Sequence, residues 1–169
     1  MATTADVLID AVDRIRDSTA RVLDGLTEEE LAFRATADAN SIAWLVWHLT
    51  RVQDDHVADA AGTDQVWSSG GWVDAFGLPF DAAATGYGMT SDEVGAVRGV
   101  TAERLLAYHD AVHDRSVEYL AGLRDADLDR IVDEAWDPPV TLAVRLVSVV
   151  SDDLQHVGQA AFVRGLLPR

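Results

Sequence analysis

The chain has 169 residues, with 29 acidic and 13 basic side chains and a formal net charge of −16. This length corresponds to one domain. The acidic balance argues against nucleic acid and against an anionic membrane surface as partners, since both are bound through clustered cations. Cysteine and lysine are absent, which excludes disulfides, thiolate ligands and Schiff-base chemistry within the chain.

Two further absences bear on location. No apolar run approaches the roughly 20 residues that cross a bilayer. The first residues carry acids where a secretory signal peptide needs a basic stretch and then an apolar one. We therefore expect a single domain over 1–169 that is cytoplasmic.

Apolar residues recur at steps of three and four along most of the chain, which is the spacing of amphipathic helices. This spacing predicts four long helices, at about 4–24, 42–61, 102–122 and 142–166. A capping box at 27–30 predicts a short additional helix toward Phe33. The predicted fold class is all-α, with the long helices forming a four-helix bundle.

The segment 62–90, between the second and third long helices, breaks the helical pattern. It holds six glycines, two serines and a proline among five aromatic residues: Trp67, Trp72, Phe76, Phe80 and Tyr87. A stretch of this length without helices is uncommon in a compact domain and is usually functional. Because its rings need a surface to cover, we expect an ordered lid. We interpret 123–140 as a mixed connector.

Candidate metal ligands lie on the second and fourth helices. His48 falls on the apolar stripe of 42–61, and Asp55 follows two turns along the same side. Asp152 and His156 are four residues apart, so both project from one face of 142–166. Bundle cores build metal sites from helix-borne carboxylates and histidines. The alternative is that His48 and His156 form internal hydrogen bonds while Asp152 is solvated.

The third helix offers a competing pair, His109 and His113, also four residues apart. An acid follows each histidine, and the glutamate that zinc proteases place inside such a motif is missing. Paired histidines flanked by acids are commonly a hydrated helix face, although His109 could also support the ligands of the other site. His56 lies among acids, and we expect it at the surface.

Two segments resemble a known family. They are SIAWLVWHL at 41–49, and DDLQHVGQ at 152–159 followed by RGL at 164–166. In these segments, in helix order and in the long connection after the second helix, the whole chain resembles the DinB-like superfamily of bacterial four-helix proteins. The similarity is greatest to actinobacterial members related to mycothiol-dependent enzymes.

This resemblance implies one divalent metal between the second and fourth long helices, with His48, Asp152 and His156 as ligands. Relatives usually carry histidine where this chain has Asp152, whereas mycothiol-dependent maleylpyruvate isomerases place a glutamate there. Two histidines and one carboxylate suit zinc, the expected ion, and are usable by nickel, manganese or iron.

In thiol-dependent relatives the metal binds a low-molecular-weight thiol such as mycothiol and lowers its pKa. By this resemblance we expect a thiol S-transferase or isomerase that acts on a small electrophilic molecule. Asp55 is the candidate catalytic base. Five residues are candidates for cofactor binding: Trp72, Phe76 and Phe80 as rings that exclude water, and Gln159 and Arg164, which match the family pattern.

Two other functions stay open from the sequence. One is a stress-associated or small-molecule-binding protein that keeps the bundle without catalysis. The other is a metal-dependent hydrolase that uses bound water. Dimerisation is common among the relatives, so a homodimer is also expected.

Overall fold

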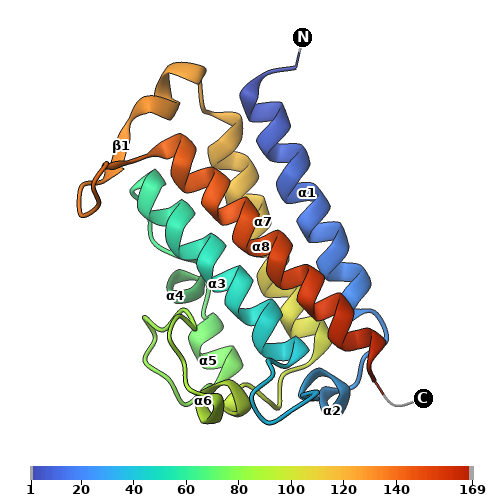
Figure 1. Ribbon diagram of the computed structural model, residues 1–169. Coiled ribbons are helices and arrows are strands. Elements are labelled where there is room, and N and C mark those ends of the chain that lie inside the picture. Colours follow the sequence, from blue (N-terminus) through green and yellow to red (C-terminus); the bar gives the residue numbers. More distant parts are fainter. Residues whose placement is uncertain (1, 168–169) are drawn as a thin grey trace.

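The computed structural model describes residues 2–167. Figure 1 shows four long helices side by side: α1 (Thr4–Leu23), α3 (Ile42–Ala61), α7 (Ala102–Ala121) and α8 (Leu142–Gly165). All four predicted long helices are confirmed, each to within one residue of its expected ends. The short helix α2 (Glu28–Leu31) follows the predicted capping box of Thr27 and Glu30. The all-α class is therefore confirmed.

Hydroxyl side chains fix where the long helices begin. Thr3, Ser41, Thr101 and Thr141 each accept a hydrogen bond from a backbone N–H in the first turn of the helix that follows. These N–H groups have no partner within the helix, so the cap supplies one. At the other end of α3, Gly62 adopts a left-handed conformation (φ 67°), which is why the helix ends there.

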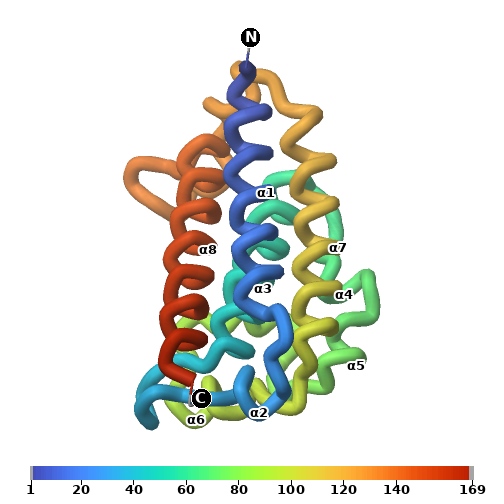
Figure 2. The backbone as a smooth tube through the Cα atoms, turned by 90° about the vertical axis from the view of Figure 1, so that its right-hand side faces the viewer, coloured from blue at the N-terminus to red at the C-terminus, as the bar shows by residue number. Residues whose placement is uncertain are grey.

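The topology explains the long connection. In Figure 1, α1 and α8 run in one direction while α3 and α7 run in the other. Helix α3 packs mainly against α8, and α1 packs mainly against α7. Figure 2 shows α1 in front, between α8 and α7. Because α3 and α7 are parallel, the chain must return along the bundle between them, and residues 62–101 make that return.

The return segment is ordered, as predicted. It contains three short helices that are not among the predicted elements: α4 (Val66–Ser69), α5 (Trp72–Phe76) and α6 (Ser91–Ala96), the last capped by Thr90. The segment covers the side of α3 that the other helices leave open. As a result, 15 of the 20 residues of α3 are buried, among them the polar residues His48, Thr50, Arg51, Gln53 and Asp54.

The connector between α7 and α8 holds structure that the sequence did not predict. A 3-10 helix η1 (Asp125–Asp129) precedes a small antiparallel hairpin of β1 (Ile131–Asp133) and β2 (Val140–Thr141). The hairpin projects from the end of the bundle where α8 begins (Figure 1). Within residues 2–167, no helix has both the length and the apolarity that crossing a membrane requires.

Candidate metal centre

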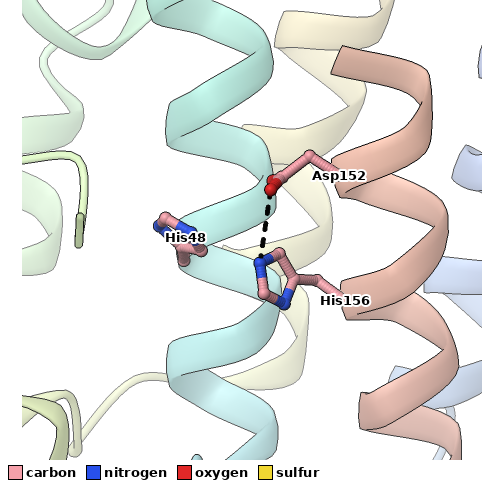
Figure 3. A group of neighbouring side chains, drawn as sticks. All are labelled: His48, Asp152 and His156. Atoms are coloured by element: carbon pink, nitrogen blue, oxygen red, sulfur yellow. Dashed lines mark ion pairs between the residues drawn. The ribbon is translucent and has the colours of Figure 1, made fainter. Parts of the chain in front are cut away.

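Three candidate ligands converge between α3 and α8. His48 points from α3 toward Asp152 and His156, which project from successive turns of α8 (Figure 3). Each of the three offers a ligand atom, and these atoms all lie within 4.8 Å of one another. It is the one such group of three or more potential ligands in the part of the chain that the structure describes. The residues predicted as ligands are thus brought together.

Hydrogen bonds orient both histidines. His48 Nδ1 lies 2.6 Å from the carbonyl oxygen of Thr85, and His156 Nδ1 lies 3.0 Å from Gln159 Oε1. An oxygen of this kind only accepts, so Nδ1 carries a proton in each ring, and Nε2 is the nitrogen that a metal would bind. Histidine ligands in metalloproteins are held in this way by a second hydrogen bond.

The packing around His48 is close. Its ring stacks on Trp44, with centroids 4.5 Å apart and planes inclined by 19°. On the other side, a Cβ built on Gly86 would fall 2.6 Å from His48 Nδ1. A side chain at position 86 would therefore push the Thr85 carbonyl away from the ring, and glycine lets the loop reach it.

The charges of the three groups are coupled. Burial lowers the pKa of His48, which favours the neutral form that binds metal. The hydrogen bond to Asp152 raises the pKa of His156, whose Nε2 lies 3.5 Å from Asp152 Oδ1. Burial raises the pKa of Asp152, but its bond with His156 and the nearby imidazoles outweigh this effect and hold it below its usual value.

The donor set fits a divalent cation. Asp152 Oδ2 is buried and has no hydrogen-bond partner, which is costly for a carboxylate oxygen unless something charged binds it. Two imidazole nitrogens and one carboxylate oxygen are a ligand set of zinc enzymes, where three protein ligands leave a position open for substrate. The alternative of a solvated Asp152 holds only in part, since its side chain is 36% exposed but its Oδ2 is buried.

A cavity of about 440 Å³ opens beside the ligands. His48 and Asp152 form part of its wall, together with Asp55, which faces it from α3 as the sequence predicted. Gln65 Nε2 donates a hydrogen bond to Asp55 Oδ1 over 2.6 Å, so the carboxylate is held in place. His56 also lines the cavity, and its side chain is 38% exposed, in keeping with the expected position at the surface.

Comparison with known proteins decides the family. The family model described as mycothiol S-transferase matches residues 7–168. The chain belongs to this family. A crystal structure of a conserved protein from Enterococcus faecalis shares the fold, with a TM-score of 0.92, 27% sequence identity and 98% of both chains covered. Among proteins with curated functions, none matches. The DinB-like resemblance is confirmed, whereas dimerisation stays a prediction.

Three predicted cofactor-binding rings lie elsewhere in this member of the family. Trp72 and Phe76 pack on Tyr108 of α7, with centroids 5.4 Å and 5.7 Å away, and Phe80 packs on Trp47 at 5.9 Å. None of the three lines the cavity beside His48. Their expected role, exclusion of water from the metal site, is not supported by this packing. The rings instead cover the apolar core.

The two predicted family residues near the end of α8 have different positions. Gln159 accepts the hydrogen bond from His156 and so orients a candidate metal ligand. Arg164 donates from Nη1 to the backbone oxygens of Arg21 and Val22, over 2.7 Å and 2.6 Å, at the end of α1. Its place in the structure is that of a link between helices, which gives its predicted cofactor role no support.

The competing pair on α7 does not form a metal site. His109 is fully buried and its Nδ1 lies 3.0 Å from Thr50 Oγ1, whereas His113 Nε2 lies 2.7 Å from Asp13 Oδ1 on α1. The two rings therefore bind different helices. His109 is also absent from the wall of the cavity, so the structure offers no link to the ligands.

Sequence reasoning missed two exposed aromatic residues at the cavity. Tyr87 is 94% exposed and Trp136, between the strands of the hairpin, is 68% exposed, yet both line it. Water-exposed rings of this size beside a cavity are typical of binding surfaces. The signal in the sequence was Trp136 itself, a large aromatic residue in an otherwise polar connector.

Proposed function

We propose that this chain is a divalent-metal-dependent transferase that joins a low-molecular-weight thiol of the mycothiol type to a small electrophilic molecule. The observation that carries the proposal is the group of His48, Asp152 and His156, of which His48 and Asp152 line a cavity of about 440 Å³. The family description, mycothiol S-transferase, names the same chemistry. An isomerisation that proceeds through a thiol adduct would use the same site.

Some residues would bind the ion, and others would act on the thiol. A divalent ion, zinc or nickel, would supply Lewis acidity that lowers the pKa of a coordinated thiol. The chain supplies no thiol of its own, since it has no cysteine, so the sulfur must come from a separate molecule. Asp55 faces the cavity, with Oδ1 bonded to Gln65 and Oδ2 3.8 Å from His56 Nδ1, and can accept the proton that the thiol gives up.

The surroundings suit a small polar ligand. Tyr87 and Trp136 stand at the cavity as exposed rings, and Asp55 and His56 provide polar atoms on the α3 side. A cavity of this size admits a small molecule but no polymer. The rings can pack against a bound thiol while the polar atoms hydrogen-bond to it, which would orient the sulfur toward the ligands.

The test combines spectroscopy and turnover. Protein purified without an affinity tag is loaded with Co²⁺, and the absorption spectrum is recorded before and after mycothiol is added. Turnover is followed with the same thiol and monobromobimane in the zinc form. We expect the thiol to change the cobalt spectrum and to react only in the presence of metal. His156→Ala should lose both the metal and the turnover.

A matched histidine variant is the control. His113 is bound to α1 outside the site, so His113→Ala should keep metal content and turnover close to the wild-type values. If the cobalt spectrum does not change when the thiol is added and the metal-loaded protein shows no turnover, the proposed function is overturned and a binding protein is favoured. Full activity after chelation would exclude the metal-dependent mechanism.

A further inference from the structure

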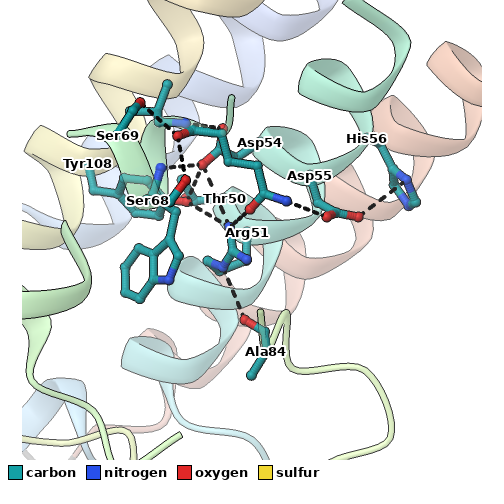
Figure 4. Close-up of polar contacts among 12 residues, drawn as sticks. Thr50, Arg51, Asp54, Asp55, His56, Ser68, Ser69, Ala84 and Tyr108 are labelled. Carbon is teal, nitrogen blue, oxygen red and sulfur yellow. Dashed lines mark hydrogen bonds and ion pairs between the residues drawn. The ribbon is translucent and has the colours of Figure 1, made fainter. Parts of the chain in front are cut away.

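Arg51 is a buried cation one turn after His48 on α3. Its side chain is 0% exposed, which is costly for a guanidinium unless several acceptors surround it. Figure 4 shows it at the centre of a network that reaches Ala84 on one side and Asp54 and Tyr108 on the other. Arg51 is not one of the three candidate ligands, and it lies outside the segment 62–90 that was predicted as a lid.

One arm of Arg51 leads to the metal ligand His48. Arg51 Nε donates to the carbonyl oxygen of Ala84 over 3.1 Å. The next carbonyl along the chain, that of Thr85, accepts the proton of His48 Nδ1. The oxygen of Ala84 lies in the Ala84–Thr85 peptide plane and the oxygen of Thr85 in the next plane, so fixing the first plane leaves only the φ and ψ angles of Thr85 to place the second oxygen. Arg51 therefore anchors the group that orients His48.

The other arm leads to Asp55. Arg51 Nη1 donates to Gln65 Oε1 over 2.8 Å, and the amide nitrogen of the same Gln65 donates to Asp55 Oδ1 over 2.6 Å. The bond from Arg51 also settles which atom of the Gln65 amide is the oxygen, since a guanidinium only donates. Gln65 thus transmits the position of Arg51 to the candidate base.

Asp54 and Trp67 hold the guanidinium of Arg51 at the centre of the network. Asp54 lies 3.6 Å from Arg51 and also accepts from the backbone nitrogens of Val66 and Trp67 at the start of α4. The guanidinium carbon lies 5.1 Å from the centre of the Trp67 ring, a cation–π distance. These contacts keep the planar fork in one orientation, which is what the two arms need.

We propose that Arg51 is a positioning residue that sets both sides of the cavity at once: the ring of His48 through the Ala84–Thr85 peptide, and the carboxylate of Asp55 through Gln65. The Asp55 arm rests on the proposed function, whereas the His48 arm concerns the histidine and its metal alone. Lysine could keep the charge beside Asp54, but its single ammonium lacks the fork that reaches two acceptors.

The first test is Arg51→Lys, read on His48. Nitrogen NMR of the metal-free protein reports which ring nitrogen carries the proton. The wild type should show His48 protonated at Nδ1, and the variant a mixture of the two forms. Competition with a chromogenic chelator should show zinc bound about tenfold more weakly, in the range that loss of a ligand's supporting hydrogen bond produces.

The second test is Gln65→Leu, which cuts the Asp55 arm alone. Zinc affinity should stay within twofold of wild type, while turnover falls. In an Asp55→Asn background, Gln65→Leu should have no further effect on turnover, because a residue that acts through another adds nothing once that residue is removed. Additive losses in this cycle would overturn the Asp55 arm.

Arg34 provides the matched control. It is another arginine that ties chain segments together, with its Nη1 and Nη2 donating to Ser91 and its Nε to the carbonyl of Ala39, but it has no contact with the cavity residues. Arg34→Lys should lower stability without changing the His48 proton or zinc affinity. Equal zinc losses in both lysine variants would overturn the proposal, as would an unchanged His48 in Arg51→Lys.

A measurement on the wild type covers the case in which Arg51→Lys does not fold. The Nε–H of Arg51 should exchange with solvent slowly, since it is bonded to Ala84 inside the protein. Rapid exchange would overturn the proposal. If wild-type His48 is protonated at Nδ1 as expected but the protein has no turnover, the proposed function is wrong, whereas the proposed role of Arg51 in orienting His48 is retained.

Discussion

Gly86 shows how closely the site depends on single residues. A Cβ there would lie 2.6 Å from His48 Nδ1 and 3.1 Å from Trp47 Cζ3, and the backbone has a φ of +99°. Gly86→Ala must therefore move the loop and break the hydrogen bond from His48 to Thr85. We expect zinc affinity to fall about tenfold, as for loss of other groups that orient a ligand. Chelator competition measures it.

Gly88 separates this effect from simple backbone strain. It also has a positive φ, +71°, but a Cβ there would meet nothing within 4 Å. Gly88→Ala should thus destabilise the loop by about 1 kcal/mol, the usual cost of that conformation, without changing zinc affinity. If both alanine variants weakened zinc binding equally, contact with His48 would not be the cause.

At the scale of the helices, Arg164 joins the end of α8 to the end of α1. It donates to the carbonyls of Arg21 and Val22 in the last turn of α1. Carbonyls in the last turn of a helix have no N–H partner within the helix. Arg164→Met should lower the free energy of unfolding by about 1–2 kcal/mol in urea titrations. Zinc affinity should not change, since His156 lies two turns earlier on α8. A large loss of zinc affinity would contradict a purely structural link.

Arg115 is the control for that change. It is 53% exposed and pairs with Glu118 on its own helix, an arrangement that contributes little in water. Arg115→Met should therefore cost less than about 0.5 kcal/mol. A comparable loss in both variants would indicate that removal of any surface charge, rather than the helix link, sets the stability.

The sequence predicts elements whose cause is local. The long helices follow from apolar spacing and from caps such as Ser41 and Thr141, which act within one turn. Helix α4 begins where the carboxylate of Asp54, twelve residues earlier, meets Val66 N–H, and nothing in the adjacent sequence signals that meeting. The hairpin strands are too short for a period-two pattern to be visible.

The same distinction holds for the site. Asp152 and His156 were predictable from their spacing on one helix, His48 was a candidate from its place on the apolar stripe, and family resemblance joined the three. The group that orients His48 was not predictable, because the carbonyl of Thr85 is a backbone atom that any residue type would supply. Trp72 and Phe76 were correctly expected to cover a surface, but the sequence does not say that they pack on Tyr108 of α7.

For the whole molecule, acid stability depends on His109 at the centre of the bundle. It is fully buried, and burial lowers its pKa from 6.5 to about 4. His113, Asp110 and Arg16 are the charged groups that also act on it. Because the unfolded chain binds this proton more readily, stability falls as the pH drops from about 6.5 toward 4, by up to about 3 kcal/mol.

His109→Gln isolates this contribution. Glutamine cannot be protonated but can keep a polar contact with Thr50 Oγ1. Urea unfolding of both proteins with chelator present, at pH 7 and pH 4.5, removes the effects of metal and of the groups common to both. The wild type should lose more stability than the variant between pH 7 and pH 4.5. The difference in unfolding free energy between wild type and variant should therefore be smaller at pH 4.5 than at pH 7, or change sign. An identical pH dependence would mean that His109 takes up its proton as easily in the folded protein as in the unfolded chain.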